Sequence, residues 1–298
     1  MATIKSALAE AQSTLERTCP SPRLDAEILL AVALAKSRPH LHAWPDKSLT
    51  DDQYRRFKNA VEKRALGTPV AYITGEREFW SRKFTITPDV LIPRPETELL
   101  VEITLELISR KRKCRVIDLG AGSGAIAVTL AAERPVLQVV ATDICAKALQ
   151  VAEINAARYT ADNIEFVQSD WFGDLSQDTF DLIISNPPYI AENDPHLVRE
   201  DIRFEPQKAL ISGPDGLDDI RKIASQSVGR LAGGGYILFE HGYDQAPAVG
   251  ALLSALGYNS VRHYRDMQGH ARVTSAQHAP GCTADRVTAK KRRTDSTP

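Results

Sequence analysis

Apolar residues in the first part of the chain recur at the spacing of amphipathic helices. Between Thr3 and Arg17 they fall every three or four positions, at Ile4, Leu8, Ala11 and Leu15, which places them on one helix face. The spacing returns after Pro22, with Leu24, Ile28, Leu29 and Val32. Thr50 and Gln53 have the spacing of a capping box that opens a third helix. Residues 1–74 are therefore predicted to form a small helical bundle.

A short hairpin is predicted to join this bundle to the rest of the chain. Phe79-Trp80 and Phe84-Thr85-Ile86 flank a brief polar turn, which is the pattern of two β-strands in an antiparallel hairpin. The predicted linker covers residues 75–92.

From residue 93 onward, short apolar runs alternate with helical patterns. Strands are predicted at 115–118, 138–143, 164–168, 181–185 and 236–240, and helices at 125–133 and 146–158. This alternation is typical of βαβ units, in which right-handed crossovers join parallel strands. Residues 93–274 are predicted to form a doubly wound α/β domain with a parallel sheet. The periodicity ends there, and residues 275–298, with the basic cluster Lys290 to Arg293, are expected to be a disordered, solvated tail.

The composition is that of a globular protein without a strong charge bias. Of 298 residues, 37 are basic and 38 acidic, and 43% are hydrophobic. A formal net charge of -1 argues against nucleic-acid binding through bulk electrostatics. The four cysteines form no C-x-x-C pair, and His40 and His42 lack further spaced ligands, so neither a disulfide framework nor a metal site is predicted. No apolar run reaches the roughly 18 residues of a membrane span, and a cytoplasmic location is expected.

A glycine-rich turn follows the first predicted strand of the α/β domain. Asp118-Leu-Gly-Ala-Gly-Ser-Gly-Ala125 holds three glycines, which let a ligand approach the backbone and permit a positive φ. The spacing also satisfies the loose dinucleotide fingerprint. Asp118 favours S-adenosylmethionine (SAM), because a carboxylate there can accept from the ammonium of a methionine moiety but would repel a pyrophosphate. The candidate cofactor-binding residues of this turn are Gly120, Ala121, Gly122, Ser123 and Gly124.

Two more candidates follow the next strands. Asp143 ends the second strand, where an acid binds the ribose hydroxyls of nucleoside cofactors of either kind. Trp171 follows the third strand and can stack on an adenine ring. Because ligands of doubly wound sheets lie across the carboxyl ends of the strands, both side chains are expected at the cofactor.

The tetrapeptide Asn186-Pro187-Pro188-Tyr189 directly follows the fourth predicted strand. A planar amide NH2 is a poor nucleophile because its lone pair is delocalised. The Asn186 side-chain oxygen and the carbonyl after it can both accept from such a group and free its lone pair for in-line attack on a sulfonium methyl. The prolines stiffen the loop, and Tyr189 offers a flat wall. Asn186, Pro187 and Tyr189 are the candidate catalytic residues, and all four are candidates for substrate binding.

These motifs carry a family resemblance. The glycine turn followed by Asn-Pro-Pro-Tyr resembles SAM-dependent methyltransferases that act on planar NH2 groups. Further segments narrow the resemblance to the peptide chain release factor N5-glutamine methyltransferases (PrmC/HemK family), over about residues 5 to 274. They include Gly75 to Trp80, Leu91 to Glu98, Gln168 to Phe172 and Arg203 to Pro206.

The resemblance implies a Rossmann-like SAM-dependent methyltransferase domain, preceded by a helical substrate-recognition domain and a β-hairpin linker. It implies methyl transfer from SAM to the side-chain amide nitrogen (N5) of the glutamine in the Gly-Gly-Gln loop of bacterial class I release factors, with a role in translation termination. Residues 186–189 would hold that glutamine. The cofactor contacts that the resemblance implies are Gly120 to Gly124, Asp143, Trp171 and Asn186.

Other activities remain open at this point. A ribosomal-protein glutamine methyltransferase resembles the same C-terminal domain but has a different N-terminal region. An adenine-N6 DNA methyltransferase shares the tetrapeptide, but no separate basic target-recognition segment is evident here, so stable nucleic-acid binding is not expected. A non-catalytic binding module is disfavoured, because the tetrapeptide, the glycine turn and Asp143 are all intact. Catalysis requires these features, whereas packing of the fold does not.

Overall fold

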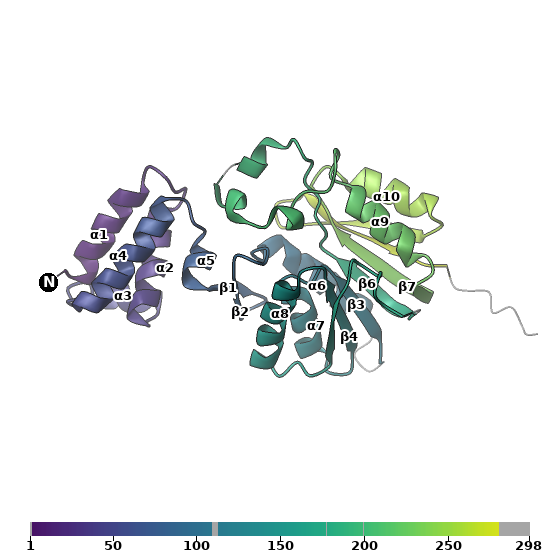
Figure 1. Ribbon diagram of the computed structural model, residues 1–298, viewed down its shortest axis with the longest axis horizontal. Helices are drawn as coiled ribbons and strands as arrows, with labels where there is room; N and C mark the ends of the chain where they lie inside the picture. Colours follow the sequence, from purple (N-terminus) through teal and green to yellow (C-terminus); the bar gives the residue numbers. More distant parts are fainter. Residues whose placement is uncertain (1, 109–112, 177, 199, 280–298) are drawn as a thin grey trace, which may run out of the picture.

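The computed structural model describes residues 2–108, 113–176, 178–198 and 200–279 of the chain. Figure 1 shows a lobe of helices at the N-terminal end and a larger α/β lobe, with a short helix and a two-stranded hairpin between them. This order is the one that the sequence predicts.

Among the described residues, four helices form the N-terminal lobe, and a short fifth helix leads from it to the hairpin. They are α1 (Ile4–Leu15), α2 (Pro22–Leu34), α3 (Arg38–Ala43), α4 (Asp51–Ala65) and α5 (Val70–Thr74). The capping box of α4 is present, because the Thr50 side chain accepts from the backbone of Gln53 while the Gln53 side chain accepts from that of Thr50. The apolar faces of α1, α2 and α4 form one core. The bundle is confirmed, and the short helices α3 and α5 were not predicted.

The predicted hairpin is present as β1 (Glu76–Phe79) and β2 (Arg82–Thr85), which pair antiparallel. Its rings Phe79 and Phe84 are buried and meet edge to face, with ring centroids 6.0 Å apart. Both rings belong to the core of the α/β lobe, so the hairpin is anchored to that lobe.

The α/β lobe is built on a seven-stranded sheet in the order β5-β4-β3-β6-β7-β9-β8. The strands are β3 (Arg115–Leu119), β4 (Gln138–Asp143), β5 (Ile164–Gln168), β6 (Phe180–Ser185), β7 (Leu231–Glu240), β8 (Asn259–Arg265) and β9 (Ala271–Gln277). The strands β3 to β7 run parallel to one another, whereas β9 is antiparallel to both β7 and β8.

Two predictions are corrected at this edge of the sheet. The parallel sheet is confirmed for the five predicted strands, β3 to β7, but the unpredicted strands β8 and β9 add an antiparallel pair, because only residues 266–270 connect them and a parallel crossover needs a dozen or so residues. The expected start of the tail is also too early. Strand β9 continues to Gln277, and Ser275 and Ala276 are buried in it. Residues 280–298 of the expected tail lie outside the described residues.

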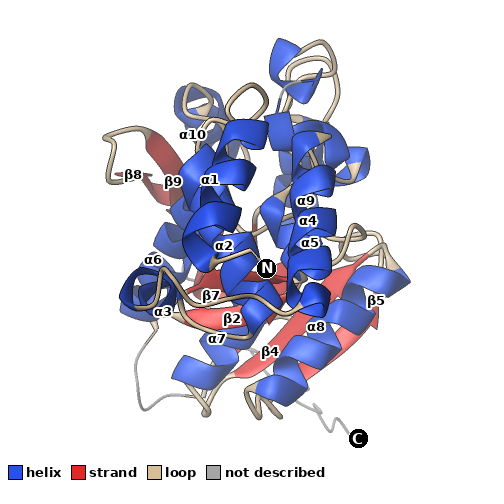
Figure 2. Cartoon of the chain, turned by 90° about the vertical axis from the view of Figure 1, so that its left-hand side faces the viewer, coloured by secondary structure: helices blue, strands red, loops and turns tan. Residues whose placement is uncertain are grey.

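Helices cover both faces of the sheet, as the doubly wound fold requires. The core on one face includes side chains of α6 (Glu98–Leu107), α7 (Ala125–Glu133) and α8 (Ala146–Arg158), and the core on the other those of α9 (Asp218–Ser227) and α10 (Ala246–Ala255). Short 3₁₀ turns lie at Pro95–Thr97, Pro195–Val198, Glu200–Phe204 and Gln207–Ala209. Figure 2 views the sheet from the side of the helical lobe. Within the described ranges, no helix combines the length and apolarity needed to cross a membrane.

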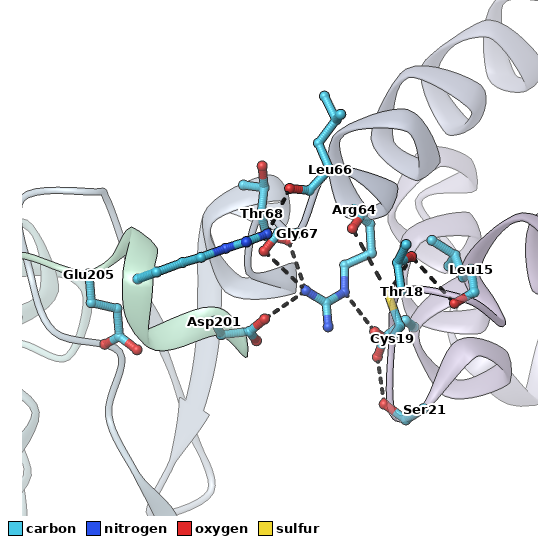
Figure 3. A network of polar contacts seen from close by, with 12 residues as sticks. Leu15, Thr18, Cys19, Ser21, Arg64, Leu66, Gly67, Thr68, Asp201 and Glu205 are labelled. Atoms are coloured by element: carbon cyan, nitrogen blue, oxygen red, sulfur yellow. Dashed lines mark hydrogen bonds and ion pairs between the residues drawn. The ribbon is translucent and has the colours of Figure 1, made fainter. Parts of the chain in front are cut away.

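The two lobes meet at a buried arginine of α4. Arg64 is 4% exposed, and its Nε donates to Asp25 Oδ2 at 2.7 Å within the helical lobe. Its Nη1 donates to Asp201 Oδ1 at 2.7 Å, across to the segment that follows β6. Arg203 of that segment reaches back and donates to the Leu66 carbonyl oxygen at 3.2 Å. Figure 3 shows the Arg64 side chain pointing toward Asp201, so the helical lobe is tied directly to the segment after β6.

Candidate active site

The candidate site lies where the sheet reverses its strand order. The chain runs from β3 outward to β4 and β5, and then returns to place β6 on the other side of β3. Leu119, the last residue of β3, is the register partner of Ser185, the last residue of β6. The glycine turn and the tetrapeptide therefore begin side by side, at the position where open α/β sheets bind ligands.

The three glycines of the turn have different neighbours. All three adopt a positive φ, of 79° at Gly120, 54° at Gly122 and 77° at Gly124. A Cβ on Gly120 would lie 3.3 Å from the Trp171 ring, and one on Gly122 would meet nothing within 4 Å. A Cβ on Gly124 would lie 2.9 Å from the Cβ of Ala152 on α8. Gly120 and Gly122 therefore keep space open, whereas Gly124 permits the close packing of α7 on α8.

Two carboxyl groups flank the turn. Asp143 accepts from the backbone N–H of Gly122 at 2.9 Å with Oδ2 and from that of Cys145 at 2.8 Å with Oδ1. Burial raises its pKa, and these two bonds oppose the rise. Asp118 is fully buried, and burial raises its pKa to about 7. Its Oδ2 accepts from the backbone of Ala127 at 3.1 Å, while Oδ1 has no partner among the described residues.

A cavity of about 530 Å³ opens beside these groups, which is within the range of small-molecule and cofactor sites. Six of the predicted site residues line it: Gly120, Gly122, Asp143, Trp171, Asn186 and Pro188. The other predicted residues, Ala121, Ser123, Gly124, Pro187 and Tyr189, are not part of the lining. The cavity is also bounded by parts that were not predicted, namely Asp89 to Leu91 of the linker and Pro206 to Ala209 after β6.

The side-chain amide of Asn186 is held on one side only. Its Nδ2 donates to the Thr97 hydroxyl at 3.3 Å. Its Oδ1 is buried and has no hydrogen-bond partner among the described residues. A buried acceptor without a partner is rare in a native protein and calls for an explanation. Asn186 is part of the cavity lining, and this oxygen keeps its capacity to accept a hydrogen bond unused.

Tyr189 is fixed through both its hydroxyl and its backbone. The hydroxyl donates to Glu240 Oε1 at 3.4 Å, and the backbone carbonyl accepts from Gln245 Nε2 at 3.0 Å. Burial, followed by the charge of Glu240, raises the pKa of Tyr189 well above its ordinary value. The phenol is therefore neutral at physiological pH and serves as a rigid wall of the tetrapeptide.

Sequence reasoning missed Thr97, Glu240 and Gln245. One signal for Glu240 is its place at the end of β7, an apolar strand of the same parallel sheet. Phe239 is the register partner of Ser185, so Glu240 comes level with Asn186. No comparable signal exists for Thr97 or Gln245, because only the packing of α6 and of the segment after β7 brings them to the tetrapeptide.

Family models match both lobes. Residues 6–75 match the PrmC N-terminal domain, and residues 96–213 match the methyltransferase small domain. The release factor glutamine methyltransferase of Vibrio cholerae is 46% identical, over 93% of this chain and 97% of that protein. The Escherichia coli protein of the same name is 43% identical, over 90% of this chain and 96% of that protein. The chain belongs to the release factor glutamine methyltransferase family.

Solved structures with little sequence identity share the fold. A methyltransferase of Pyrococcus furiosus superposes with a TM-score of 0.52 at 16% identity, covering 74% of this chain and 99% of that one. The catalytic domain of human Mettl16 gives 0.55 at 19% identity, covering 75% and 82%. Both support the methyltransferase architecture of the α/β lobe.

Membership in this family makes the chain an enzyme, a methyltransferase whose methyl donor is SAM. The residues around the cavity fit that cofactor. The glycine turn presents backbone without Cβ atoms, Asp143 presents carboxylate oxygens, and Trp171 presents an aromatic ring. Within the described part of the chain, no three His, Cys, Asp or Glu side chains lie close enough together to hold a metal ion.

Proposed function

We propose that this chain methylates the side-chain amide nitrogen, N5, of the glutamine in the Gly-Gly-Gln loop of bacterial class I peptide chain release factors. The names of the relatives support this substrate, and those relatives match nearly the full length of both chains. The match to the PrmC N-terminal domain supports a protein substrate that is gripped by the helical lobe, residues 1–74.

The cofactor is held by the turn from Gly120 to Gly124, by Asp143 and Trp171, and by Asn186 on the substrate side. Each Asp143 oxygen already accepts one backbone N–H, and its remaining lone pairs accept from the ribose hydroxyls. Trp171 contacts the base, and Gly120 keeps the backbone clear of that ring. SAM supplies a sulfonium-bound methyl group that a nitrogen lone pair can attack.

One observation carries the proposed chemistry, namely the buried, unpartnered Oδ1 of Asn186. An acceptor at this place takes a hydrogen bond from the NH2 of the substrate glutamine. The carbonyl of Pro187 accepts from the second N–H, so the nitrogen is held with its lone pair toward the methyl group. Orientation of this kind contributes up to about 7–11 kcal/mol to a bimolecular reaction.

The remaining residues of the tetrapeptide keep this geometry fixed. Pro187 and Pro188 restrict the backbone and contribute no N–H that could compete for the acceptors. Tyr189 provides the flat surface against which the planar amide lies. As the nitrogen gains a methyl group its proton becomes acidic and passes to water, so the chain does not have to supply a base.

Methyl transfer from labelled SAM, followed by peptide mass spectrometry, tests the substrate. The purified chain is offered a release factor, a ribosomal-protein mixture and adenine-containing DNA in parallel. We expect label on the Gly-Gly-Gln glutamine, and none on a release factor in which that glutamine is replaced by alanine. Label on a ribosomal protein or on DNA alone would retain the chemistry at NH2 groups and reject the release factor as substrate.

A further inference from the structure

A buried acidic side chain that belongs to none of the sequence motifs lies behind the tetrapeptide. Glu240 is 1% exposed at the end of β7. Its Oε1 accepts from the Tyr189 hydroxyl at 3.4 Å, and its Oε2 has no partner among the described residues. Burial of a carboxyl group without full compensation is unfavourable. A residue that served only to fill space here would be better as an apolar side chain.

Thr97 connects this carboxyl to Asn186. Thr97 is 4% exposed, just before α6, and its side chain lies near enough to Glu240 to favour the charged form of that carboxyl. Its Oγ1 also accepts from Asn186 Nδ2 at 3.3 Å. A threonine hydroxyl has a single proton to donate. With that proton directed at the neighbouring carboxyl, the lone pairs of Oγ1 accept from the NH2 of Asn186, and the amide oxygen of Asn186 is left without a partner among the described residues.

The segment after Glu240 holds Tyr189 from the other end. Gln245 Oε1 accepts from the backbone N–H of Gly242 at 2.8 Å, and Gln245 Nε2 donates to the Tyr189 carbonyl at 3.0 Å. A Cβ on Gly216 would collide with the same carbonyl. Residues 240–245 therefore clamp Tyr189 at its hydroxyl and at its backbone.

The charges around Glu240 come from three elements. Arg272 of β9 attracts its negative charge, Glu96 of the turn before α6 repels it, and Tyr189 donates to it. The arginine acts through its charge alone, since its own Nε donates to Asp266 at 3.2 Å. The two hydroxyls next to Glu240 are those of Tyr189, which belongs to the tetrapeptide, and Thr97, which contacts Asn186.

We propose that Glu240 is a positioning residue for methyl transfer, which fixes Tyr189 directly and sets the orientation of the Asn186 amide through Thr97. The proposal rests on the proposed function, because Asn186 and Tyr189 are taken to hold the substrate glutamine. Glu240 touches neither substrate nor cofactor in this account, and its effect is confined to the geometry of the acceptor.

Steady-state kinetics of Glu240→Gln, Glu240→Ala, Thr97→Val and Thr97→Ser test the proposal, with Glu102→Gln as control. Glutamine offers one acceptor oxygen and alanine none. We therefore expect kcat to fall roughly tenfold in Glu240→Gln and roughly a hundredfold in Glu240→Ala, which is the loss of rate that a misplaced reacting group causes. Thr97→Val removes the hydroxyl that connects Glu240 to Asn186, so its kcat should fall by a similar factor. Thr97→Ser keeps a hydroxyl at this position and should retain most of the activity. KM for the release factor and the dissociation constant for SAM stay within about threefold. Glu102 is an exposed carboxylate on α6 and is not part of the connection from Glu240 through Thr97 to Asn186.

A second readout requires no substrate. The side-chain NH2 of Asn186, assigned by NMR through its loss in Asn186→Ala, exchanges slowly when Thr97 accepts from it. We expect faster exchange in Glu240→Gln and Thr97→Val than in Glu102→Gln. Unchanged exchange, or a folded Glu240→Gln enzyme with kcat within threefold of the wild type, overturns the positioning role. A wild-type chain with a protected Asn186 amide but no transfer to a release factor overturns only the proposed substrate.

Discussion

The Ser185 hydroxyl donates to the backbone carbonyl of Leu119 at 2.7 Å, and both residues are fully buried. This bond joins the last residues of β6 and β3, directly before the tetrapeptide and the glycine turn. It fixes the relative height of the two loops, one of which we propose to hold the cofactor and the other the substrate amide. Their distance is therefore set by the rigid sheet and not by the loops themselves.

Two glycine substitutions in the turn should separate packing from ligand binding. Gly124→Ala places a Cβ 2.9 Å from Ala152 at a φ of +77°, so we expect a loss of about 1–3 kcal/mol in the free energy of unfolding. Gly122→Ala meets no atom within 4 Å and bears only the strain of its φ of +54°, so we expect a smaller loss of stability than in Gly124→Ala and a larger effect on SAM affinity. Urea unfolding and calorimetric titration with SAM measure the two effects. Equal losses of stability in both variants would contradict this division.

The pH dependence of stability should report the buried carboxyl of Glu240. Its folded pKa is raised from 4.5 to about 7, so the folded state binds the extra proton. The stability that this proton contributes is present below about pH 4.5 and is lost as pH rises through 7.

Because glutamine does not ionise, Glu240→Gln should gain stability relative to the wild type between pH 5 and pH 8, by an amount on the order of 3 kcal/mol. The raised pKa of Asp118 changes the stability in the same direction. Because Asp118 is present in both proteins, it does not contribute to the difference between them. Urea unfolding at the two pH values measures the difference. A constant gap between variant and wild type would show that Glu240 is not buried as described.

The sequence predicted the parts of the fold in which local pattern and tertiary environment agree. Strand β4 and helices α7 and α8 have the predicted bounds, because glycine and polar positions interrupt their apolar runs. Strand β8 was missed, since none of its residues is buried and it lies at the sheet edge. An edge strand of this kind carries little hydrophobic periodicity.

The sequence predicted those site residues that belong to short motifs directly after a strand. The cavity lining includes six of them, from Gly120 to Pro188. The supporting residues Thr97 and Gln245 each lie directly before a helix, about 90 residues before and 60 after Asn186, and nothing local marks them. Gly124 was assigned to the cofactor on its motif alone, whereas its closest neighbour is Ala152.

Removing the buried arginine between the lobes should cost more than removing its exposed partner. Arg64→Ala leaves Asp25, which is 5% exposed, without its ion pair. The expected loss is about 3 kcal/mol. Asp201 has a side chain that is 39% exposed, so Asp201→Asn should cost about 1 kcal/mol or less.

Thermal unfolding compares these two variants, and limited proteolysis after β6 reports the release of the segment that Asp201 and Arg203 attach to the helical lobe. We expect faster cleavage there in both variants. Unaltered cleavage would mean that the contact between Arg64 and Asp201 does not hold this segment.

The most direct test of the account is methyl transfer by Asn186→Ala. The substitution removes the buried acceptor Oδ1, and the account predicts that transfer from labelled SAM to the release factor glutamine falls by at least a hundredfold under single-turnover conditions. Calorimetry should show SAM binding within a few-fold of the wild type, with an unchanged melting temperature. Transfer at the wild-type rate by a folded Asn186→Ala chain would contradict the central claim that this oxygen holds the amide for attack.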